Sequence, residues 1–378
     1  MKERLLQFGG GNFLRAFVDL MLHEANADND AFGRAVVVTS TSSRRSQWIN
    51  EQKGCYHVVL RGLQDARPVD ETITVSRALH RCIPAADAWP DVLAVARSAE
   101  LSWIVSNTTE AGLRLDPADT QSTCLAALDP NHGRAPHSFP AKLLAVLACR
   151  MAAGLPAVTI LPCELLEDNG PLLLELLRTQ ADIWKLPQDL LDAVETCPIP
   201  STLVDRIVSG RPDEHPLRQQ DQLLTVAEPY ALWVIEDLPG IDLFPHAAIT
   251  ITGDVSEYAL RKVRILNGAH TALVCMTRSM GIETVSAALA HADIGPRIRR
   301  LLLEEILPVI NDRVIDAESF VDTTLERFAN PYLHHRLADI ALHNETKVAT
   351  RLRPTYDEHV EMFGAPPPLL GEILQPYL

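Results

Sequence analysis

The sequence predicts an α/β protein with a parallel sheet in its N-terminal part and a mostly α-helical C-terminal part. Three observations support this prediction. A short apolar strand at the N-terminus runs into a glycine-rich turn and a helical stretch. Buried strands and helical stretches then alternate as far as Gln180. After Gly240 the apolar residues recur at helical spacing.

The N-terminal strand, residues 4–8 (RLLQF), leads directly into residues 9–13 (GGGNF). A strand, a glycine turn and a helix in this order form the opening of a Rossmann-type dinucleotide-binding domain. We expect Gly9 to make the tight turn and Gly11 to let the backbone approach a pyrophosphate. Leu14 replaces the usual third glycine, so a wider contact between helix and strand is expected. A plain glycine-rich β-turn is the alternative. The candidate cofactor-binding residues here are Phe8, Gly9, Gly11, Asn12 and Phe13.

The second strand, residues 35–41 (AVVVTST), bears on the choice of coenzyme. It ends without the carboxylate that NAD sites usually use to bind the ribose diol. Two serines and then Arg44 and Arg45 follow. These arginines are either a site for the 2′-phosphate of NADP or a solvated pair. These observations leave the choice between NAD and NADP open; NAD is the expected cofactor, with NADP as the alternative.

Polar residues follow two further strands of the predicted sheet. Residues 102–106 (SWIVS) lead into a polar turn, residues 107–112 (NTTEAG), and residues 157–163 (AVTILPC) precede Glu164. Ligands bind open α/β sheets at the carboxyl ends of the strands. Ser106, Asn107 and Thr108 are therefore further cofactor-binding candidates.

The remaining predicted elements set the domain boundary. Residues 56–61 and 72–76 alternate like a hairpin, and residues 141–153 and 171–180 are predicted helices. The helical remainder includes residues 286–290, 298–310, 317–328 and 333–341. We expect a dinucleotide-binding domain at residues 1–245 and a helical substrate and catalytic domain at residues 246–378.

The helical part begins with residues 258–275 (YALRKVRILNGAHTALVC), which carry the candidate catalytic residues Lys262, Asn267 and His270. At about 100° per residue, His270 falls about 80° and Asn267 about 140° from Lys262 on an α-helix, so we expect the three side chains to share one face about two turns long. A buried lysine suits acid/base chemistry near neutral pH, and an asparagine amide can stabilise an oxyanion. A histidine can orient the lysine or hold a substrate hydroxyl. The alternative is a buried helix with a salt-bridged lysine, a capping asparagine and a packed histidine.

Composition limits the partners and the compartment. The net charge of −15 argues against non-specific binding of nucleic acid or of anionic membranes. No apolar run is long enough to span a membrane, and the N-terminus begins with a strand-like stretch. The seven cysteines show no CxxC spacing and no HExxH occurs, so we expect free, mostly packed thiols, no metal site and a cytoplasmic location. At 378 residues, two domains are expected.

The segment KVRILNGAH resembles the Lys-x4-Asn-x2-His signature of the polyol-specific long-chain dehydrogenases, the mannitol dehydrogenase family. LQFGGGNFLRAF, IVSNTTEAG, SFPAK, LPCELLEDNG, VDRIV and EPYALWVIE point the same way. Among them, QFGxGNFLRAF, SNTTEAG and CELxxxNG are closest to the tagaturonate reductase (altronate oxidoreductase) branch. The resemblance implies metal-independent hydride transfer at a secondary alcohol, with NAD or NADP. It also implies that Lys262 is the general acid/base, that Asn267 lends an oxyanion-hole amide and that His270 supports both lysine and substrate.

A second oxyanion asparagine of the family corresponds to Leu165 here, and Asn169 is the candidate replacement. A sugar-acid substrate also needs a cation for its carboxylate. The substrate-binding candidates are Asn169, Arg206, Arg264, Lys347 and Arg351. The expected reaction interconverts a tagaturonate-like keto sugar acid and its altronate-like alcohol. A mannitol, mannonate (fructuronate) or other polyol dehydrogenase and a catalytically silent nucleotide-binding regulatory protein are the alternatives. The oligomeric state is left open.

Overall fold

A computed structural model describes residues 2–28, 30–40, 44–108 and 112–377. The chain forms two compact units. We call the first the sheet unit; it comprises Met1–Leu60, Glu71–Ala227 and Ala231–Val255. We call the second the helical unit; it comprises Arg61–Asp70, Glu228–Tyr230 and Ser256–Leu378. The helical unit therefore includes a hairpin tip and a short segment that are distant from it in sequence.

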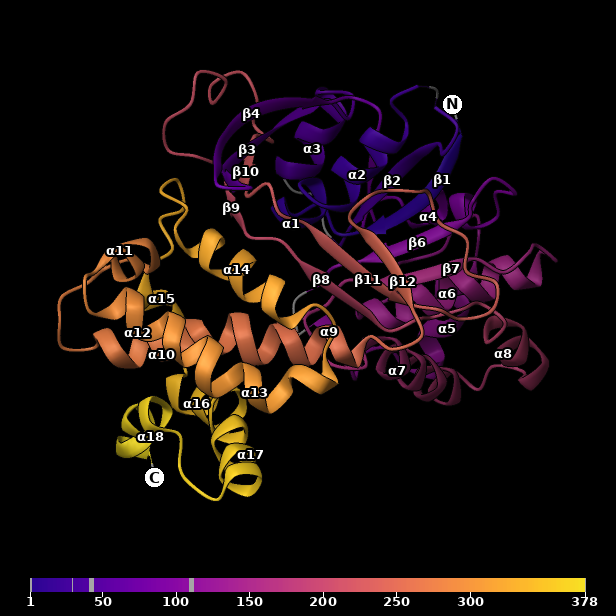
Figure 1. Ribbon diagram of the computed structural model, residues 1–378. Helices are drawn as coiled ribbons and strands as arrows, with labels where there is room; N and C mark the ends of the chain where they lie inside the picture. The colour runs from indigo at the N-terminus through magenta and orange to yellow at the C-terminus, as the bar shows by residue number, and fades with distance from the viewer. Residues whose placement is uncertain (1, 29, 41–43, 109–111, 378) are drawn as a thin grey trace. The chain divides into compact units, whose positions relative to one another are not determined.

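The sheet unit is built on a five-stranded parallel sheet with the order β5-β2-β1-β6-β7 (Figure 1). The chain starts in the middle of the sheet, builds outward to one edge, and then crosses back to build the other. The order thus reverses between β1 and β6, as in a Rossmann domain. The predicted α/β class is confirmed. The strands are β1 (Glu3–Phe8), β2 (Arg34–Thr39), β5 (Leu79–Pro84), β6 (Trp103–Ser106) and β7 (Thr159–Pro162).

Apolar side chains cover both faces of this sheet. Successive residues of a strand point to opposite faces, and in β1 Leu6 enters one core cluster while Leu5 enters the other. On the first face, α6 is buried along nearly its whole length among α4, α5, α7 and α8. The helices of this unit are α1 (Asn12–Arg15), α2 (Val18–Ala25), α3 (Arg44–Glu51), α4 (Trp89–Ala96), α5 (Gln121–Leu128), α6 (Phe139–Ala152), α7 (Asn169–Trp184) and α8 (Gln188–Val194).

Two smaller sheets complete the strands, with the orders β4-β3-β10-β9 and β12-β11-β8. The predicted hairpin is present but longer than expected. Its two-residue turn is Asp65-Ala66, with φ of 52° and 57°, the positive values that a type I′ turn requires. Strands β5, β8, β9, β10, β11 and β12 were not predicted. The strands are β3 (Tyr56–Gln64), β4 (Arg67–Val75), β8 (Thr202–Asp205), β9 (Val208–Gly210), β10 (Thr225–Ala227), β11 (Leu232–Glu236) and β12 (Ile249–Thr252).

The helical unit packs its helices around one apolar cluster that includes Ile265, Leu273 and Ile306. Two stretches are π-helices, η2 and η3. The elements are α9 (Ser256–Arg261), η2 (Lys262–Asn267), α10 (Gly268–Thr277), α11 (Val285–Ala290), α12 (Ile294–Arg300), η3 (Leu301–Ile306), α13 (Leu307–Ile310), η4 (Asn311–Arg313), α14 (Ala317–Phe328), α15 (Leu337–Ile340), α16 (Asn344–Arg351), α17 (Arg353–Phe363), α18 (Pro368–Leu374) and η5 (Gln375–Tyr377).

The predicted helix at residues 333–341 is wrong over its first half. Arg336 forms an antiparallel bridge with Thr284, and the carbonyl oxygen of His335 accepts a hydrogen bond from the backbone N–H of Val285. These contacts keep residues 335 and 336 extended, so helix α15 begins only at Leu337. Apolar spacing alone does not reveal such a pairing.

The seven cysteines are free thiols, and five of them are buried. Burial raises the pKa of Cys163 well above its ordinary value and raises that of Cys82 to about 11. Thiols with raised pKa values are poor nucleophiles near neutral pH. The expectation of free, mostly packed cysteines is therefore confirmed.

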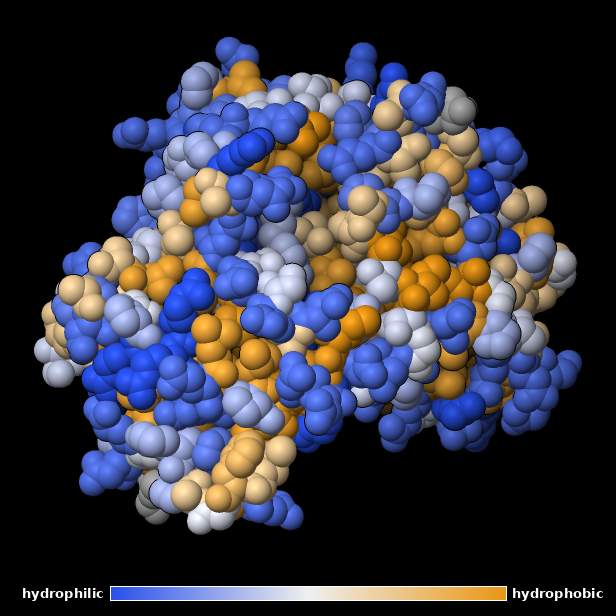
Figure 2. Space-filling view, in the orientation of Figure 1, coloured by the Kyte–Doolittle hydropathy of each residue, from blue (hydrophilic) through white to orange (hydrophobic). Residues whose placement is uncertain are grey.

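The visible surface is mostly hydrophilic, with apolar patches between the charged residues (Figure 2). This agrees with the high net charge of the chain. Within the described residues, no helix combines the length and the apolar character that crossing a bilayer requires.

A buried ion pair anchors the segment Glu228–Tyr230 within the helical unit. Arg327 donates to the two carboxylate oxygens of Glu228 at 2.7 and 3.0 Å, and both side chains are 2% exposed. The Arg327 guanidinium also lies over the ring of Tyr230, 4.3 Å from its centroid. Two parallel hydrogen bonds and a stacked ring compensate in part for the desolvation of both charges.

Glu228→Ala is expected to lower the free energy of unfolding by about 3–5 kcal/mol, because it leaves the Arg327 charge buried without its carboxylate. Urea-induced unfolding followed by circular dichroism measures the loss. The control is Glu195→Ala, which removes the partner of Arg178 in a pair with side chains 53% and 28% exposed. That loss should stay below about 1 kcal/mol. Equal losses for the two variants would contradict the prediction.

The sheet unit also buries a carboxyl group completely. Asp19 on α2 has no exposed surface, and burial raises its pKa to about 7 although Gln7 and Arg15 act in the opposite direction. The folded protein therefore holds the Asp19 proton more tightly than the unfolded chain, where the pKa is near 3.8. By linkage, this group makes the fold less stable as the pH rises from about 4 to about 7.

Asp19→Asn removes this titration. The free energy of unfolding of the wild type, relative to that of the variant, is expected to fall between about pH 4 and pH 7 and to level off above. The slope is at most about 1.4 kcal/mol per pH unit. Paired urea titrations at several pH values measure this difference, in which the contributions of all other groups cancel. A difference that is independent of pH would show that Asp19 is ionised throughout.

Candidate active site

The glycine turn after β1 has the backbone geometry that the sequence argument requires. Gly9 has a φ of 121°, and a Cβ atom there would lie 3.3 Å from the carbonyl oxygen of Asn107. A side chain at this position would therefore be strained. Gly11 behaves differently, because a Cβ added to it meets nothing within 4 Å. The backbone at Gly11 thus faces open space, which a ligand can approach.

The expected single helix after this turn is instead broken into α1 and α2. The hydroxyl of Tyr56 donates to the carbonyl oxygen of Arg15 at 2.8 Å, and Arg206 donates to that of Ala16 at 2.7 Å. Both carbonyls are thereby drawn away from regular helical bonding, and α1 ends after four residues. Leu14, in place of the third glycine, is buried with its Cδ1 3.5 Å from the Cβ position of Gly9.

The other candidates at this turn have packing or bracing side chains. Phe8 is buried against Phe139, with ring centroids 5.2 Å apart, and Phe13 stacks on Phe17 at 4.9 Å. The Asn12 side-chain oxygen accepts a hydrogen bond from Arg15 at 2.7 Å. The backbone N–H groups of Asn12 and Phe13, at the start of α1, are thus the groups left for a ligand, whereas the backbone of Phe8 is paired within the sheet.

The loop after β6 lies beside the glycine turn, since the backbone N–H of Asn107 donates to the carbonyl oxygen of Phe8 at 3.2 Å. The loop is held by Glu164, which follows β7. The Glu164 carboxylate accepts hydrogen bonds from the hydroxyl of Ser106 at 3.1 Å and from the backbone and hydroxyl of Thr108 at 2.8 and 3.1 Å. Asn107 donates to the carbonyl of Cys163 at 2.6 Å. The carboxyl ends of β1, β6 and β7 therefore form one connected edge.

Sequence reasoning noted Glu164 but gave it no role. Its position directly after a buried strand was the available signal. Burial raises the pKa of Glu164, and the hydrogen bonds from Thr108 and Ser106 oppose this rise. Two stretches that were expected to contribute polar groups, residues 41–43 and 109–111, lie outside the described residues.

Asn169 is fully engaged by the protein itself. It is buried, donates to the carbonyl oxygens of Pro162, Glu164 and Thr202 at 3.0–3.3 Å, and accepts from the backbone N–H of Thr202 at 2.9 Å. These bonds tie β7 to β8 and leave no free donor for an oxyanion. Leu165, where the family has asparagine, is 66% exposed.

Two arginines that were candidates for binding the substrate carboxylate also make hydrogen bonds within the protein. Arg264 is buried and donates to Thr355 at 2.7 Å and to Glu358 at 2.8 Å. Arg206 braces the break between α1 and α2 through the carbonyl of Ala16. We therefore assign structural roles to Asn169 and Arg264 and do not carry either forward as a substrate ligand.

The signature residues of the helical unit lie on and just after a π-helix, so the assumption of a regular α-helix was wrong for this stretch. Lys262 and Asn267 are the first and last residues of η2, and His270 follows on α10. In an α-helix, residues five apart are separated by about 140° around the axis. The i→i+5 bonding of a π-helix instead brings the fifth residue back to the same side. Lys262 and Asn267 are therefore expected to lie nearer to each other around the axis than in an α-helix, and both are partly exposed.

His270 is buried and lies between two other rings. Its ring centroid is 4.2 Å from that of Phe328 and 4.8 Å from that of His335. Burial, followed by the charges of His335 and Arg327, holds the pKa of His270 well below its ordinary value. The imidazole is therefore neutral near pH 7. Its Nε2 atom is buried without a hydrogen-bond partner among the described residues.

Cations from α14 and α16 surround His270. Besides Arg327, both Lys347 and Arg351 contribute to lowering its pKa. Lys347 donates to the carbonyl of Ile340 at 2.7 Å, and Arg351 reaches the hydroxyl of Thr271 at 3.5 Å. Burial lowers the pKa of Lys347 and of Arg351. Lys347 and Arg351 were predicted, whereas Arg327 and His335 were missed because no local pattern brings them to α10.

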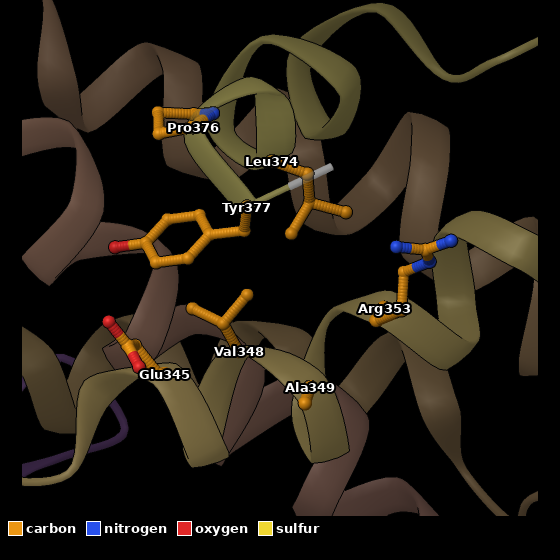
Figure 3. A pocket seen from close by; sticks show the side chains of 7 residues that line it. All are labelled: Glu345, Val348, Ala349, Arg353, Leu374, Pro376 and Tyr377. Atoms are coloured by element: carbon orange, nitrogen blue, oxygen red, sulfur yellow. The ribbon is translucent and has the colours of Figure 1, made fainter.

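A separate pocket of about 310 Å³ lies against another face of α16 (Figure 3). None of the predicted site residues lines it. Its walls are formed by Glu345, Val348, Ala349, Arg353, Leu374, Pro376 and Tyr377. In the part of the chain that the structure describes, no group of three or more His, Cys, Asp or Glu side chains could hold a metal ion.

Comparison with known proteins gives two family matches that together span most of the chain. Residues 3–243 match the mannitol dehydrogenase Rossmann domain, and residues 254–372 match the mannitol dehydrogenase C-terminal domain. The chain is 38% identical to an altronate oxidoreductase of Halalkalibacterium halodurans, over 98% of this chain and 73% of the relative. It is 37% identical to that of Bacillus subtilis, over 97% and 77%.

Two solved structures share the fold. One is a D-sorbitol dehydrogenase in substrate-free form, with a TM-score of 0.81, 20% identity and coverage of 96% of this chain and 77% of that chain. The other is the Pseudomonas fluorescens mannitol 2-dehydrogenase in a ternary complex with NAD and D-mannitol, with a TM-score of 0.76, 20% identity and coverage of 99% and 78%. By its two domain matches and its sequence identity to curated relatives, the chain belongs to the mannitol dehydrogenase family.

Proposed function

We propose that this protein is an NAD-dependent oxidoreductase that interconverts a keto sugar acid of the tagaturonate type and its alcohol, of the altronate type. The placement of Lys262 and Asn267 at the two ends of η2, next to a neutral His270, carries this proposal. The curated relatives named altronate oxidoreductase support the choice of substrate class.

The sheet unit fits a dinucleotide at the carboxyl edge of β1 and β6. The backbone of Gly9, Gly11 and Asn12 and the loop from Ser106 to Thr108 would hold it, because Gly11 faces open space at the reversal of strand order. When bound, NAD supplies the hydride acceptor, and its reduced form the donor. The described part of the β2 end carries no carboxylate, and Arg44 and Arg45 are exposed at the start of α3, so NADP is tested beside NAD.

The helical unit would supply the proton and stabilise the charge. As the ketone is reduced, the Lys262 ammonium gives a proton to the oxygen that is gaining negative charge. In the opposite direction the neutral amine takes that proton from the alcohol. The Asn267 amide N–H donates to the same oxygen, which is the role of an oxyanion hole. His270, being neutral, can exchange a hydrogen bond with a neighbouring substrate hydroxyl through its unpartnered Nε2.

The cations beside His270 would select an acid over a neutral sugar. Arg327 is already paired with Glu228, whereas among the described residues Lys347 donates to a backbone carbonyl and Arg351 to a threonine hydroxyl, and neither forms an ion pair. A substrate carboxylate can therefore pair with Lys347 and Arg351 through charge-assisted hydrogen bonds. Arg351, with its planar guanidinium, suits bidentate binding of a carboxylate.

A substrate panel tests the proposal. Tagaturonate, fructuronate, fructose and a phosphorylated ketose are each offered with NADH and with NADPH. Tagaturonate with NADH should give a kcat/KM at least about 100-fold above that for fructose. Arg351→Met should remove most of this preference while leaving fructose reduction unchanged. The matched control is Arg353→Met, since Arg353 is exposed and pairs with Asp357. A wild type that reduces fructose as well as the keto acids would instead be a polyol dehydrogenase.

Lys262→Ala should keep the affinity for NADH but lower kcat by a factor of about 100 to 10,000, the range for loss of a general acid. Stopped-flow reduction and fluorescence titration with NADH measure the two quantities. Lys262→Arg keeps the positive charge but cannot transfer a proton, because arginine stays protonated at accessible pH. This variant therefore distinguishes the two roles of Lys262. If Lys262→Arg turned over at nearly the wild-type rate, Lys262 would act only as a positive charge.

A further inference from the structure

Three buried polar side chains lie beneath the glycine turn of the sheet unit. Gln7 precedes the turn on β1, Arg15 ends α1 and Asp19 lies on α2; they are 0%, 2% and 0% exposed. The Gln7 amide donates to the carbonyl oxygen of Gly9 at 3.0 Å and to the Asp19 carboxylate at 3.3 Å. The Arg15 guanidinium donates to the carbonyl oxygen of Gly10 at 2.5 Å. Two consecutive carbonyls of the turn are thus bound from below.

Binding these carbonyls also fixes the amides of the turn. In a planar trans peptide, the C=O and the following N–H point in opposite directions. When the carbonyls of Gly9 and Gly10 point into the unit, the N–H groups of Gly10 and Gly11 must point outward. Beside them, the position of a Cβ on Gly11 has no atom within 4 Å, whereas that of Gly10 packs against Val37 and Ile49. Outward-directed backbone amides next to each other form an anion-binding concavity.

Arg15 is itself held firmly in place. Its second terminal nitrogen donates to the side-chain oxygen of Asn12 at 2.7 Å and to the carbonyl of Leu223 at 3.2 Å. Its own carbonyl accepts from the hydroxyl of Tyr56 at 2.8 Å. Because its guanidinium and its backbone carbonyl are both hydrogen-bonded, Arg15 can hold the Gly10 carbonyl in one orientation. The positive charge of Arg15 beneath the amides favours an anion above them.

Burying these polar side chains is unfavourable for the free energy of folding. The Oε1 of Gln7 and the Nε of Arg15 are both buried without a hydrogen-bond partner among the described residues. Each such atom loses its hydration without full compensation. An apolar core of the same volume would avoid this loss. The polar groups are therefore better explained by the carbonyls that they bind.

We propose that Gln7, Arg15 and Asp19 form a positioning network that directs the amides of Gly10 and Gly11 toward the pyrophosphate of a dinucleotide. Gln7 and Arg15 bind the two carbonyls, and Asp19 holds the Gln7 amide in place. The proposal rests on the proposed function in one respect, that the turn binds NAD. It adds residues that do not themselves touch the cofactor.

Arg15→Met and Gln7→Met test the network, because methionine keeps length and removes the donor. Each should raise the Kd for NADH about tenfold, the effect of losing one well-oriented hydrogen bond to a charged group. The matched control is Arg150→Met. Arg150 is also a buried arginine that donates to backbone carbonyls, at Ala96, Ser98, Leu101 and Pro156, away from the turn. It should lower the melting temperature and leave the Kd unchanged. NADH fluorescence and thermal unfolding provide the two readouts.

Fragments of the cofactor separate positioning from general loosening. ADP-ribose contains the pyrophosphate, so its inhibition constant should rise as much as the Kd for NADH. Adenosine lacks phosphate, so its inhibition constant should stay within about twofold of the wild-type value. An equal rise for both fragments would mean that the variants merely loosen the unit and would overturn the proposal. Arg15→Lys, which keeps a charge and a donor, should recover part of the affinity.

The outcomes also separate this proposal from the proposed function. A wild type that binds neither NADH nor NADPH would refute the cofactor assignment itself. A wild type that binds NADH, together with Gln7→Met and Arg15→Met variants of equal affinity, would overturn only the network. If Arg15→Met fails to fold, Gln7→Met alone decides, since it removes a neutral side chain and leaves the Arg15 contacts in place.

Discussion

The i→i+5 hydrogen bonding of η2 is the constraint on which the proposed chemistry depends. On an α-helix, a lysine and an asparagine five residues apart would lie about 140° apart around the axis, which is unfavourable for binding one substrate oxygen with both side chains. One π turn reduces this offset while the helix runs on without a break from α9 to α10. The spacing in Lys-x4-Asn therefore has a backbone reason. The three residues that follow, up to His270, return to α-helical geometry, which brings the imidazole close to the same side.

Both candidate sites contain polar atoms that are buried without a hydrogen-bond partner among the described residues. In the helical unit this atom is the Nε2 of His270, and in the sheet unit such atoms lie under the glycine turn. Most buried polar groups in proteins are hydrogen-bonded, so exceptions require an explanation. At His270 the buried nitrogen is the atom for which we propose a hydrogen bond with a substrate hydroxyl. Under the turn, the explanation is that the same side chains orient the backbone, because they bind the carbonyl oxygens of Gly9 and Gly10.

Much of the fold could be predicted from the sequence, because local patterns of apolar residues indicate many of its strands and helices. Continuous apolar strands indicated a sheet covered on both faces, and α14 was predicted with its observed bounds. The misses have a common cause. The break between α1 and α2 depends on Tyr56 and Arg206, and the extended stretch before α15 depends on Thr284, all distant in sequence. Asn169 looked like a ligand because its backbone partners could not be read from the chain. The hairpin turn was hidden since Asp65-Ala66 lacks the glycine that usually marks it.

The charges around His270 lead to a last inference about the substrate. Arg327 has its carboxylate in Glu228, but Lys347 and Arg351 share the neighbourhood of a neutral imidazole, and Arg351 lowers the pKa of Lys347. Cations that are partly withdrawn from water and repel one another weaken the fold unless an anion joins them. A substrate carboxylate would compensate both positive charges at once. A neutral polyol would leave the repulsion between the two cations in place. The positive charges of Lys347 and Arg351, which add to the effect of burial on His270, are thus the electrostatic basis for proposing a sugar acid as substrate.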